Sequence, residues 1–143
     1  MMVKDLMTRN PEIVGSGDPV KKAAELMEKN NVGAVPVFDE GGGAVGVLTD
    51  RDIALRLVAG GKDPQTTKTG DIMSRAVVYC PDDAHASKAA QIMEEKKIRR
   101  LLVRDPRGKV TGIVSLGDLA KGLSKDKAGK LIRQVSKPAA PPG

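Results

Sequence analysis

The stretch GVLTDRDI at residues 46–53 decides the fold, because it returns 66 positions later as GIVSLGDL at residues 112–119. The likeness extends at the same offset, without a gap, over residues 3–57 and 69–123. A repeat of this length indicates that one supersecondary unit occurs twice. The sequence therefore predicts a fold built from two equivalent halves.

The two repeats share the order β-α-β-β-α. In the first, Asp18 is expected to cap a helix that has Pro19 at its first position. The Gly-rich turn at 39–43 is typical of a β-hairpin. The expected elements are strands at 13–14, 34–38 and 44–48 with helices at 19–27 and 50–59, then strands at 77–80, 101–103 and 110–114 with helices at 86–93 and 116–123.

A three-stranded sheet with helices on one face leaves its other apolar face open, and two such units can cover each other. We therefore predict an α/β (α+β) protein whose two tandem units pack as an intramolecular pseudo-two-fold dimer with a cleft between them. The expected divisions are a first unit at 1–60, a linker at 61–68, a second unit at 69–123, and a tail at 124–143 that starts as a short basic helix over 124–136 and is disordered from Lys137.

The composition favours a folded cytoplasmic protein. Hydrophobic residues make up 40% of the 143 residues, with Phe38 and Tyr79 as the aromatic ones. The one cysteine, Cys80, fits a reducing compartment and a buried strand position. We expect neither an N-terminal leader nor a membrane span. The net charge of +6 is concentrated in residues 66–143, which suggests an anionic partner.

In each repeat a hydroxyl residue follows the last strand. Three positions later an acid stands at the start of the second helix. The pairs are Thr49 with Asp52 and Ser115 with Asp118. Such a pair can form a capping box, in which each side chain bonds the other residue's backbone amide. The same helix start offers amides and positive potential to a phosphate, and its carboxylate can bind a ribose diol. Both interpretations stay open at this point.

The two half-sites differ in charge. Arg99 and Arg100 precede the strand at 101–103, where two guanidinium groups suit phosphate recognition, although a solvated surface pair is the alternative. The first repeat has Gly33-Ala34 at these positions. The sequence therefore predicts one half-site that is better suited to phosphate than the other.

Little in the sequence favours catalysis. One histidine, His85, and one cysteine cannot make a usual zinc site, and no nucleophile–base pair is indicated. The G-x-G-x-x-G pattern at 41–46 joins two strands instead of a strand and a helix, so it indicates a hairpin and not a dinucleotide site. We predict that the protein is not an enzyme.

The duplicated pattern resembles the CBS domain. The segments that carry the resemblance are VGAVPVFDE at 32–40, IRRLLVRD at 98–105 and the two repeat ends quoted above. Two copies form a CBS pair, or Bateman module, and the resemblance covers residues 3–123. It implies a regulatory module that binds AMP, ADP, ATP or S-adenosylmethionine in clefts between the two units. The chain is similar to small stand-alone prokaryotic proteins of this family.

The resemblance also assigns residues to two sites. In the family the acid of the repeat end binds ribose hydroxyls, and basic residues before the second strand meet phosphate. The main site it implies contains Thr8, Ile13, Val32, Gly33, Arg99, Arg100, Ser115 and Asp118. The second, weaker site contains Thr49, Arg51, Asp52, Val78 and Ile98.

Two other functions compete with nucleotide sensing. A ligand-free module for protein interaction or dimerisation would use both acid motifs as helix caps only. Nucleic-acid binding is suggested by the pI near 9.6, but the near absence of aromatic residues argues against base stacking. We further expect a homodimer that forms a disc of four units, because the second helices carry apolar residues such as Leu55 and Val58. A partner protein is a further candidate, and no membrane partner is expected.

Overall fold

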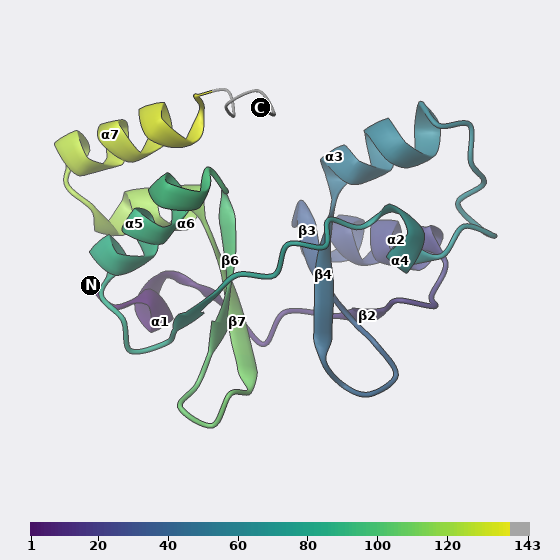
Figure 1. The fold of residues 1–143 in the computed structure, drawn as a ribbon, viewed down its shortest axis with the longest axis horizontal. Helices are drawn as coiled ribbons and strands as arrows, with labels where there is room; N and C mark the ends of the chain where they lie inside the picture. Colours follow the sequence, from purple (N-terminus) through teal and green to yellow (C-terminus); the bar gives the residue numbers. More distant parts are fainter. Residues whose placement is uncertain (138–143) are drawn as a thin grey trace, which may run out of the picture. The chain divides into compact units, whose positions relative to one another are not determined.

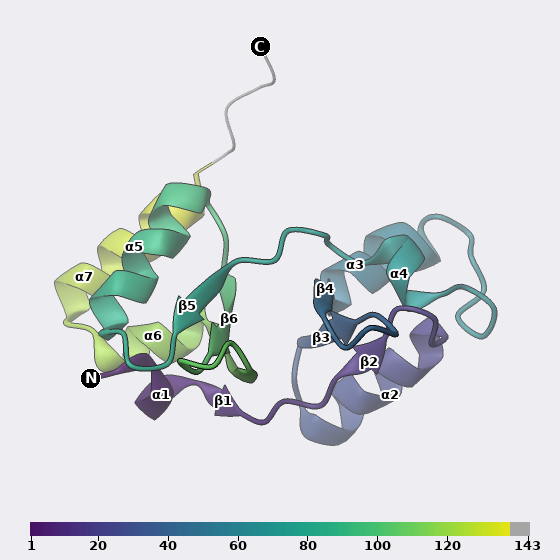
Figure 2. The same cartoon turned by 60° about the horizontal axis from the view of Figure 1, so that its bottom comes forward.

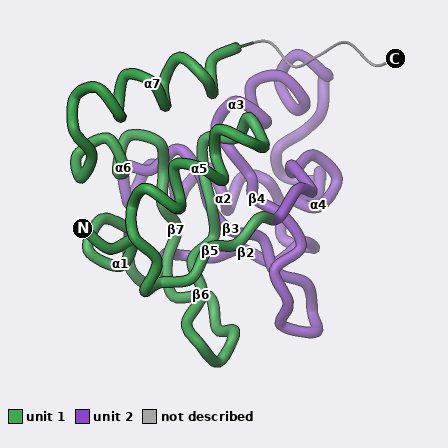
Figure 3. Tube along the Cα trace, turned by 60° about the vertical axis from the view of Figure 1, so that its left-hand side comes forward, with its two compact units in different colours: residues 1–10, 78–143 green, residues 11–77 purple. Residues whose placement is uncertain are grey.

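A computed structural model describes residues 1–137 and divides the chain into two compact units. Unit 1 combines residues 1–10 with the chain from residue 78 onward, and unit 2 consists of residues 11–77 (Figure 3). The compact units therefore cut the chain differently from the sequence repeats. The segment that opens each repeat belongs to the unit formed by the rest of the other repeat.

Unit 2 is built on a three-stranded sheet of order β2-β3-β4. Its elements are β2 (Val14–Gly15), α2 (Val20–Asn30), β3 (Ala34–Phe38), β4 (Ala44–Thr49), α3 (Asp50–Asp52), the π-helix η1 (Ile53–Val58) and α4 (Thr69–Ile72), as Figure 1 shows. β2 runs parallel to β3, and β3 and β4 form an antiparallel hairpin. The predicted hairpin around residues 39–43 is thereby confirmed.

Unit 1 repeats this plan with one strand added. Its elements are α1 (Val3–Leu6), β1 (Thr8–Arg9), β5 (Tyr79–Pro81), α5 (Ala86–Lys96), β6 (Arg100–Arg104), β7 (Val110–Ser115), α6 (Leu116–Gly122) and α7 (Lys125–Val135). The sheet order is β1-β7-β6-β5, with β1 antiparallel to β7. The mixed α+β architecture with two tandem units agrees with the prediction.

Each unit has its own hydrophobic core beneath one face of its helices. In α2 the residues Val20, Ala23 and Met27 are buried, as their helical spacing predicts, because they lie on one face of the helix. In α5 the buried residues are Ala86, Ala89, Ala90 and Met93. The small alanines allow the helices to approach the sheets closely.

The prediction that Asp18 caps the first helix was wrong. The helix begins at Val20 after Pro19, and no side chain caps it. The Asp18 carboxylate instead accepts the Gly15 amide at 2.8 Å and the Lys22 ammonium at 3.1 Å. These two contacts hold the pKa of Asp18 below its usual range. The residue therefore closes the turn before the helix, where it has a nearer donor than the first-turn amides.

The predicted basic helix after the second repeat is confirmed as α7. Its residues Leu131 and Val135 are buried in the unit 1 core, and it packs on α5 and α6 (Figure 2). Most of its outward residues are charged, which explains why the segment reads as basic in sequence. The prediction of disorder covers Lys137 and residues 138–143. Because residues 138–143 lie outside the described residues, it stays a prediction.

Cys80 is fully buried in β5, as its sequence context predicts. Burial raises the pKa of its thiol to about 11, with a further contribution from Asp82. In the described part of the chain, no helix is long and apolar enough to cross a membrane.

The buried thiol leads to a testable prediction. With a pKa of about 11, the thiolate fraction at pH 8 falls to about one in a thousand, against roughly a quarter for an ordinary cysteine. We expect a thiol reagent to label native protein at least ~100-fold more slowly than urea-denatured protein. Equal labelling rates in the two states would contradict the burial of Cys80.

Candidate functional site

Both hydroxyl–acid pairs form capping boxes. The Asp52 amide donates to Thr49 Oγ1 at 3.1 Å, and the Thr49 amide donates to the Asp52 carboxylate at 3.0 Å. In unit 1 the Asp118 amide donates to Ser115 Oγ at 3.1 Å, and the Ser115 amide donates to the Asp118 carboxylate at 2.9 Å. The capping interpretation is therefore confirmed, and any ligand role must come in addition to it.

The start of the second strand lies next to this helix start in each unit. In unit 1 Arg100 is paired with Ser115, and the Leu116 amide donates to the Arg99 carbonyl at 2.8 Å. In unit 2 Ala34 is paired with Thr49, and the Asp50 amide donates to the Gly33 carbonyl at 3.0 Å. The antiparallel hairpin thus brings the predicted phosphate residues and the predicted ribose acid of one unit to the same end of the sheet.

The acid of unit 2 has both carboxylate oxygens engaged. Besides the Thr49 amide, Asp52 accepts the Ser74 hydroxyl at 3.1 and 3.2 Å. The Arg56 guanidinium lies 3.6 Å from Asp52 and donates to the carbonyls of Ile72 and Met73, each at 3.0 Å. Only 6% of Asp52 is exposed. Its carboxylate therefore ties α3 and η1 to the segment that follows α4.

The acid of unit 1 has far fewer partners. At the same offset of 66, Thr8 corresponds to Ser74 and Gly122 to Arg56. Thr8 is exposed, and Gly122 has no side chain to donate from. Across residues 1–137 the only hydrogen-bond donor to the Asp118 carboxylate is the Ser115 amide. Asp118 is half-buried and keeps an oxygen available as an acceptor.

The predicted site residues divide between the units. Unit 1 holds the predicted residues Thr8, Val78, Ile98, Arg99, Arg100, Ser115 and Asp118. Unit 2 holds Ile13, Val32, Gly33, Thr49, Arg51 and Asp52. Each predicted site draws on both units, so the joining of the two halves stays a prediction. Within unit 1, the pairing of β6 with β7 places the backbones of Arg99, Arg100, Ser115 and Asp118 at one end of the sheet.

The structure adds contacts from five residues that were not predicted as site residues: Arg56 and Ser74 in unit 2, and Lys97, Gln134 and Ser136 in unit 1. Arg56 and Ser74 engage Asp52, and Ser74 could have been found because it matches the predicted Thr8 at the repeat offset. In unit 1, Lys97 Nζ donates to the Gln134 carbonyl at 3.0 Å, and Arg99 Nη2 lies 3.5 Å from Ser136 Oγ. No local sequence signal joins Lys97 and Arg99 to the end of α7, because 37 positions separate each pair.

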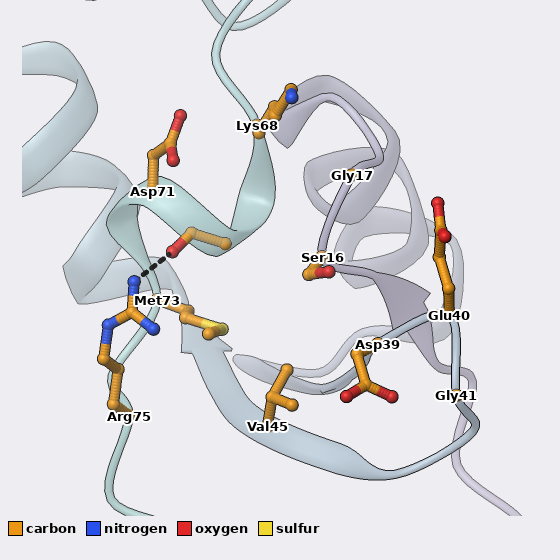
Figure 4. Close-up of a pocket in the computed structure, with 11 residues that line it drawn as sticks. Ser16, Gly17, Asp39, Glu40, Gly41, Val45, Lys68, Asp71, Met73 and Arg75 are labelled. Carbon is orange, nitrogen blue, oxygen red and sulfur yellow. Dashed lines mark hydrogen bonds between the residues drawn. The ribbon is translucent and has the colours of Figure 1, made fainter.

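A cavity of about 610 Å³ lies in unit 2 (Figure 4). It is at the hairpin end of β3 and β4, whereas Gly33 and Thr49 lie at the opposite end of these strands. Its lining residues are Ser16, Gly17, Asp39, Glu40, Gly41, Val45, Lys68, Gly70, Asp71, Met73 and Arg75. None of the predicted site residues lines it. Because exposed groups of both charges surround it, the cavity does not favour one class of ligand.

The histidine that the sequence contains has a structural role. His85 caps α5 by accepting the Ser87 amide at 3.1 Å. Among residues 1–137 there is no group of three or more His, Cys, Asp or Glu placed to hold a metal ion.

The fold is a duplicated β-α-β-β-α unit. In each copy the second helix starts with a capping box next to the start of the second strand, an arrangement that defines a duplicated regulatory module. A family model for the CBS domain matches residues 3–59 and 70–125. The chain belongs to the CBS domain family and is a CBS pair.

Relatives and solved structures agree with this assignment. The chain is 41% identical over 135 residues to the CBS domain-containing protein YhcV of Bacillus subtilis, and the match covers 94% of each protein. A conserved CBS domain protein of Thermoplasma acidophilum superposes with a TM-score of 0.82 at 28% identity, over 94% of this chain and 75% of that one. The crystal structure of CBSX2 in complex with AMP gives a TM-score of 0.66 at 29% identity, over 85% of this chain and 94% of that one.

Proposed function

We propose that this CBS pair senses an adenine nucleotide (AMP, ADP or ATP) or S-adenosylmethionine, and that unit 1 supplies the ribose contact and, for a nucleotide, the phosphate contacts. The observation that carries the proposal is the contrast between the two acids. Asp52 has its carboxylate engaged by side chains of its own unit, whereas the Asp118 carboxylate has, among the described residues, only the Ser115 amide as a donor and lies at the end of the sheet where β6 begins with Arg100. A half-buried carboxylate with a free oxygen suits a ribose diol.

The phosphate end of the proposed site lies at Arg99 and Arg100. Arg100 is half-buried and paired with Ser115, so its position is fixed by the sheet, while Arg99 is exposed. Two guanidinium groups at a strand start can bind phosphate oxygens with paired hydrogen bonds. The AMP bound to CBSX2 supports the choice of ligand class. Ile13, Val32 and Gly33 of unit 2 remain the proposed residues for the adenine side.

Melting curves with AMP, ADP, ATP and S-adenosylmethionine, followed by calorimetry with the best ligand, test the proposal. We expect one of the four to raise the melting temperature and to bind with a stoichiometry near one per chain, since the Asp52 half-site is occupied from within. A ligand that binds only the native state of a protein stabilises that protein by about 2.7 kcal/mol at a hundredfold excess over Kd. No shift with any of them would favour the ligand-free interaction module instead.

We also propose a homodimer formed through η1 of unit 2. Leu55 is 52% exposed and Val58 is 70% exposed on η1. The equivalent positions in unit 1 are Lys121 and Ser124, and there α7 packs on α6. The equivalent surfaces of the two repeats therefore differ. The surface on η1 is apolar and is not covered by a helix like α7. A second copy can cover it because a two-fold axis pairs the patch with itself.

Leu55→Lys combined with Val58→Ser gives unit 2 the residues of unit 1 and tests this interface. Burial of each large apolar side chain contributes about 1.5–3 kcal/mol, so we expect the dimer Kd to rise more than tenfold. Light scattering at micromolar concentration should change from a dimer mass to a monomer mass. Lys121→Ala is the control and should leave the mass unchanged. A wild-type chain that is already monomeric would contradict the proposal.

A further inference from the structure

Two cations beside the proposed phosphate position are held by the end of α7. Lys97 Nζ donates to the Gln134 carbonyl at 3.0 Å, and Arg99 Nη2 lies 3.5 Å from Ser136 Oγ. Gln134 and Ser136 belong to the last turn and C-cap of the same helix. The charged ends of Lys97 and Arg99 are therefore gathered within one helical turn of each other.

The end of α7 acts on these cations as a weak anion. A helix of eleven residues carries a partial negative charge at its C-terminus from carbonyls without helical partners. Lysine and arginine near that end are stabilised by it, in addition to the two hydrogen bonds. Both cations are exposed, so they can exchange this partner for a stronger one without breaking the core.

We propose that α7 and the nucleotide phosphate compete for Lys97 and Arg99, so that nucleotide binding loosens the last turn of α7. The inference rests on the proposed nucleotide site of unit 1. A phosphate bound at Arg99 would carry full negative charge close to the negative end of the helix, and the two repel. It would also claim the guanidinium fork that now faces Ser136. Leu131 and Val135 keep the rest of α7 in the core.

In this proposal the binding of nucleotide changes the stability of the last turn of α7. By linkage, a phosphate that weakens the contacts of α7 must bind more tightly when those contacts are removed. Ser136→Ala is therefore expected to raise the affinity for AMP about twofold, because it removes a competitor for Arg99. If Ser136 were itself a ligand contact, the same change would lower the affinity.

Amide exchange followed by NMR, with AMP as the probe and calorimetry on the same samples, tests the competition. The reporters are the amides of Ser136, which donates to Ile132, and Lys137, which donates to Gln134. We expect saturating AMP to speed their exchange about fivefold, the size of a weak allosteric coupling. The Ala128 amide, which donates to Ser124 at the other end of α7, should not change.

Lys97→Gln should speed exchange of the same two amides without AMP and reduce the further effect of AMP. Lys96→Gln is the matched control, since it removes the same charge one position away and should reproduce the wild type. Binding of AMP with unchanged or slower exchange at Ser136 and Lys137 would overturn the competition while leaving the nucleotide site intact. Absence of binding by AMP, ADP, ATP and S-adenosylmethionine alike, with no melting shift and no binding heat, would overturn both the competition and the proposed function.

Discussion

Asp52→Ala is expected to lower the free energy of unfolding by about 3 kcal/mol, because it breaks a buried charged network. The change leaves the Thr49 amide and the Ser74 hydroxyl without their acceptor and the Arg56 guanidinium without its neighbouring carboxylate. Asp52 is almost fully buried, so the amide and hydroxyl that it leaves behind are poorly hydrated. In a domain of this size the loss corresponds to a fall in melting temperature of roughly 10 °C.

The repeat supplies the matched control for this measurement. Asp118→Ala removes the equivalent acid, but it leaves only the Ser115 amide without a partner, so a capping loss of about 1 kcal/mol is expected. Urea titrations of both variants without nucleotide give the comparison. Equal losses at the two positions would mean that the Ser74 and Arg56 contacts add nothing, and the distinction between the two acids would fail.

Local sequence signals were enough to predict the hairpin and the first long helix of each repeat, but not α1, β1, α4 or the π-helical form of η1. The turn at 39–43 and the apolar spacing of α2 and α5 act over a few residues, and the structure contains the expected hairpin and helices. The predicted helix cap at Asp18 was wrong by one residue because the Gly15 amide competes for its carboxylate. Such competition depends on the geometry of the turn, and the amino-acid types alone do not predict that geometry.

Contacts between distant segments could not be predicted in the same way. Thr8 pairs with Ile113, and Ser74 forms a bridge with Val47, so each opening segment joins a sheet formed by the other repeat. The offset of 66 shows that these positions are equivalent but not which sheet they join. The two pairings are equivalent at this offset, so the different engagement of Asp52 and Asp118 comes from the Ser74 hydroxyl contact and from the change of Arg56 to Gly122, and it needed the structure.

The second large effect is expected on nucleotide affinity. Asp118→Asn should reduce the affinity for the ligand found in the melting screen at least about tenfold, because a charge-assisted bond to the ribose is replaced by a neutral one. The free oxygen of Asp118 is the group that would make this bond. Asp52→Asn should leave the affinity within about twofold, since that carboxylate is already engaged inside unit 2.

The same variant separates the ligand role of Asp118 from its capping role. Asparagine can still accept the Ser115 amide through its carbonyl oxygen, so the melting temperature without nucleotide should stay nearly constant. A cap contributes to stability with or without ligand, whereas a ribose acceptor contributes only when nucleotide is bound. The decisive measurement is a pair of melting curves, with and without nucleotide, for wild type and Asp118→Asn. If the variant melts lower without nucleotide while its nucleotide-induced shift stays at the wild-type value, Asp118 is a cap alone and the proposed site loses its ribose contact.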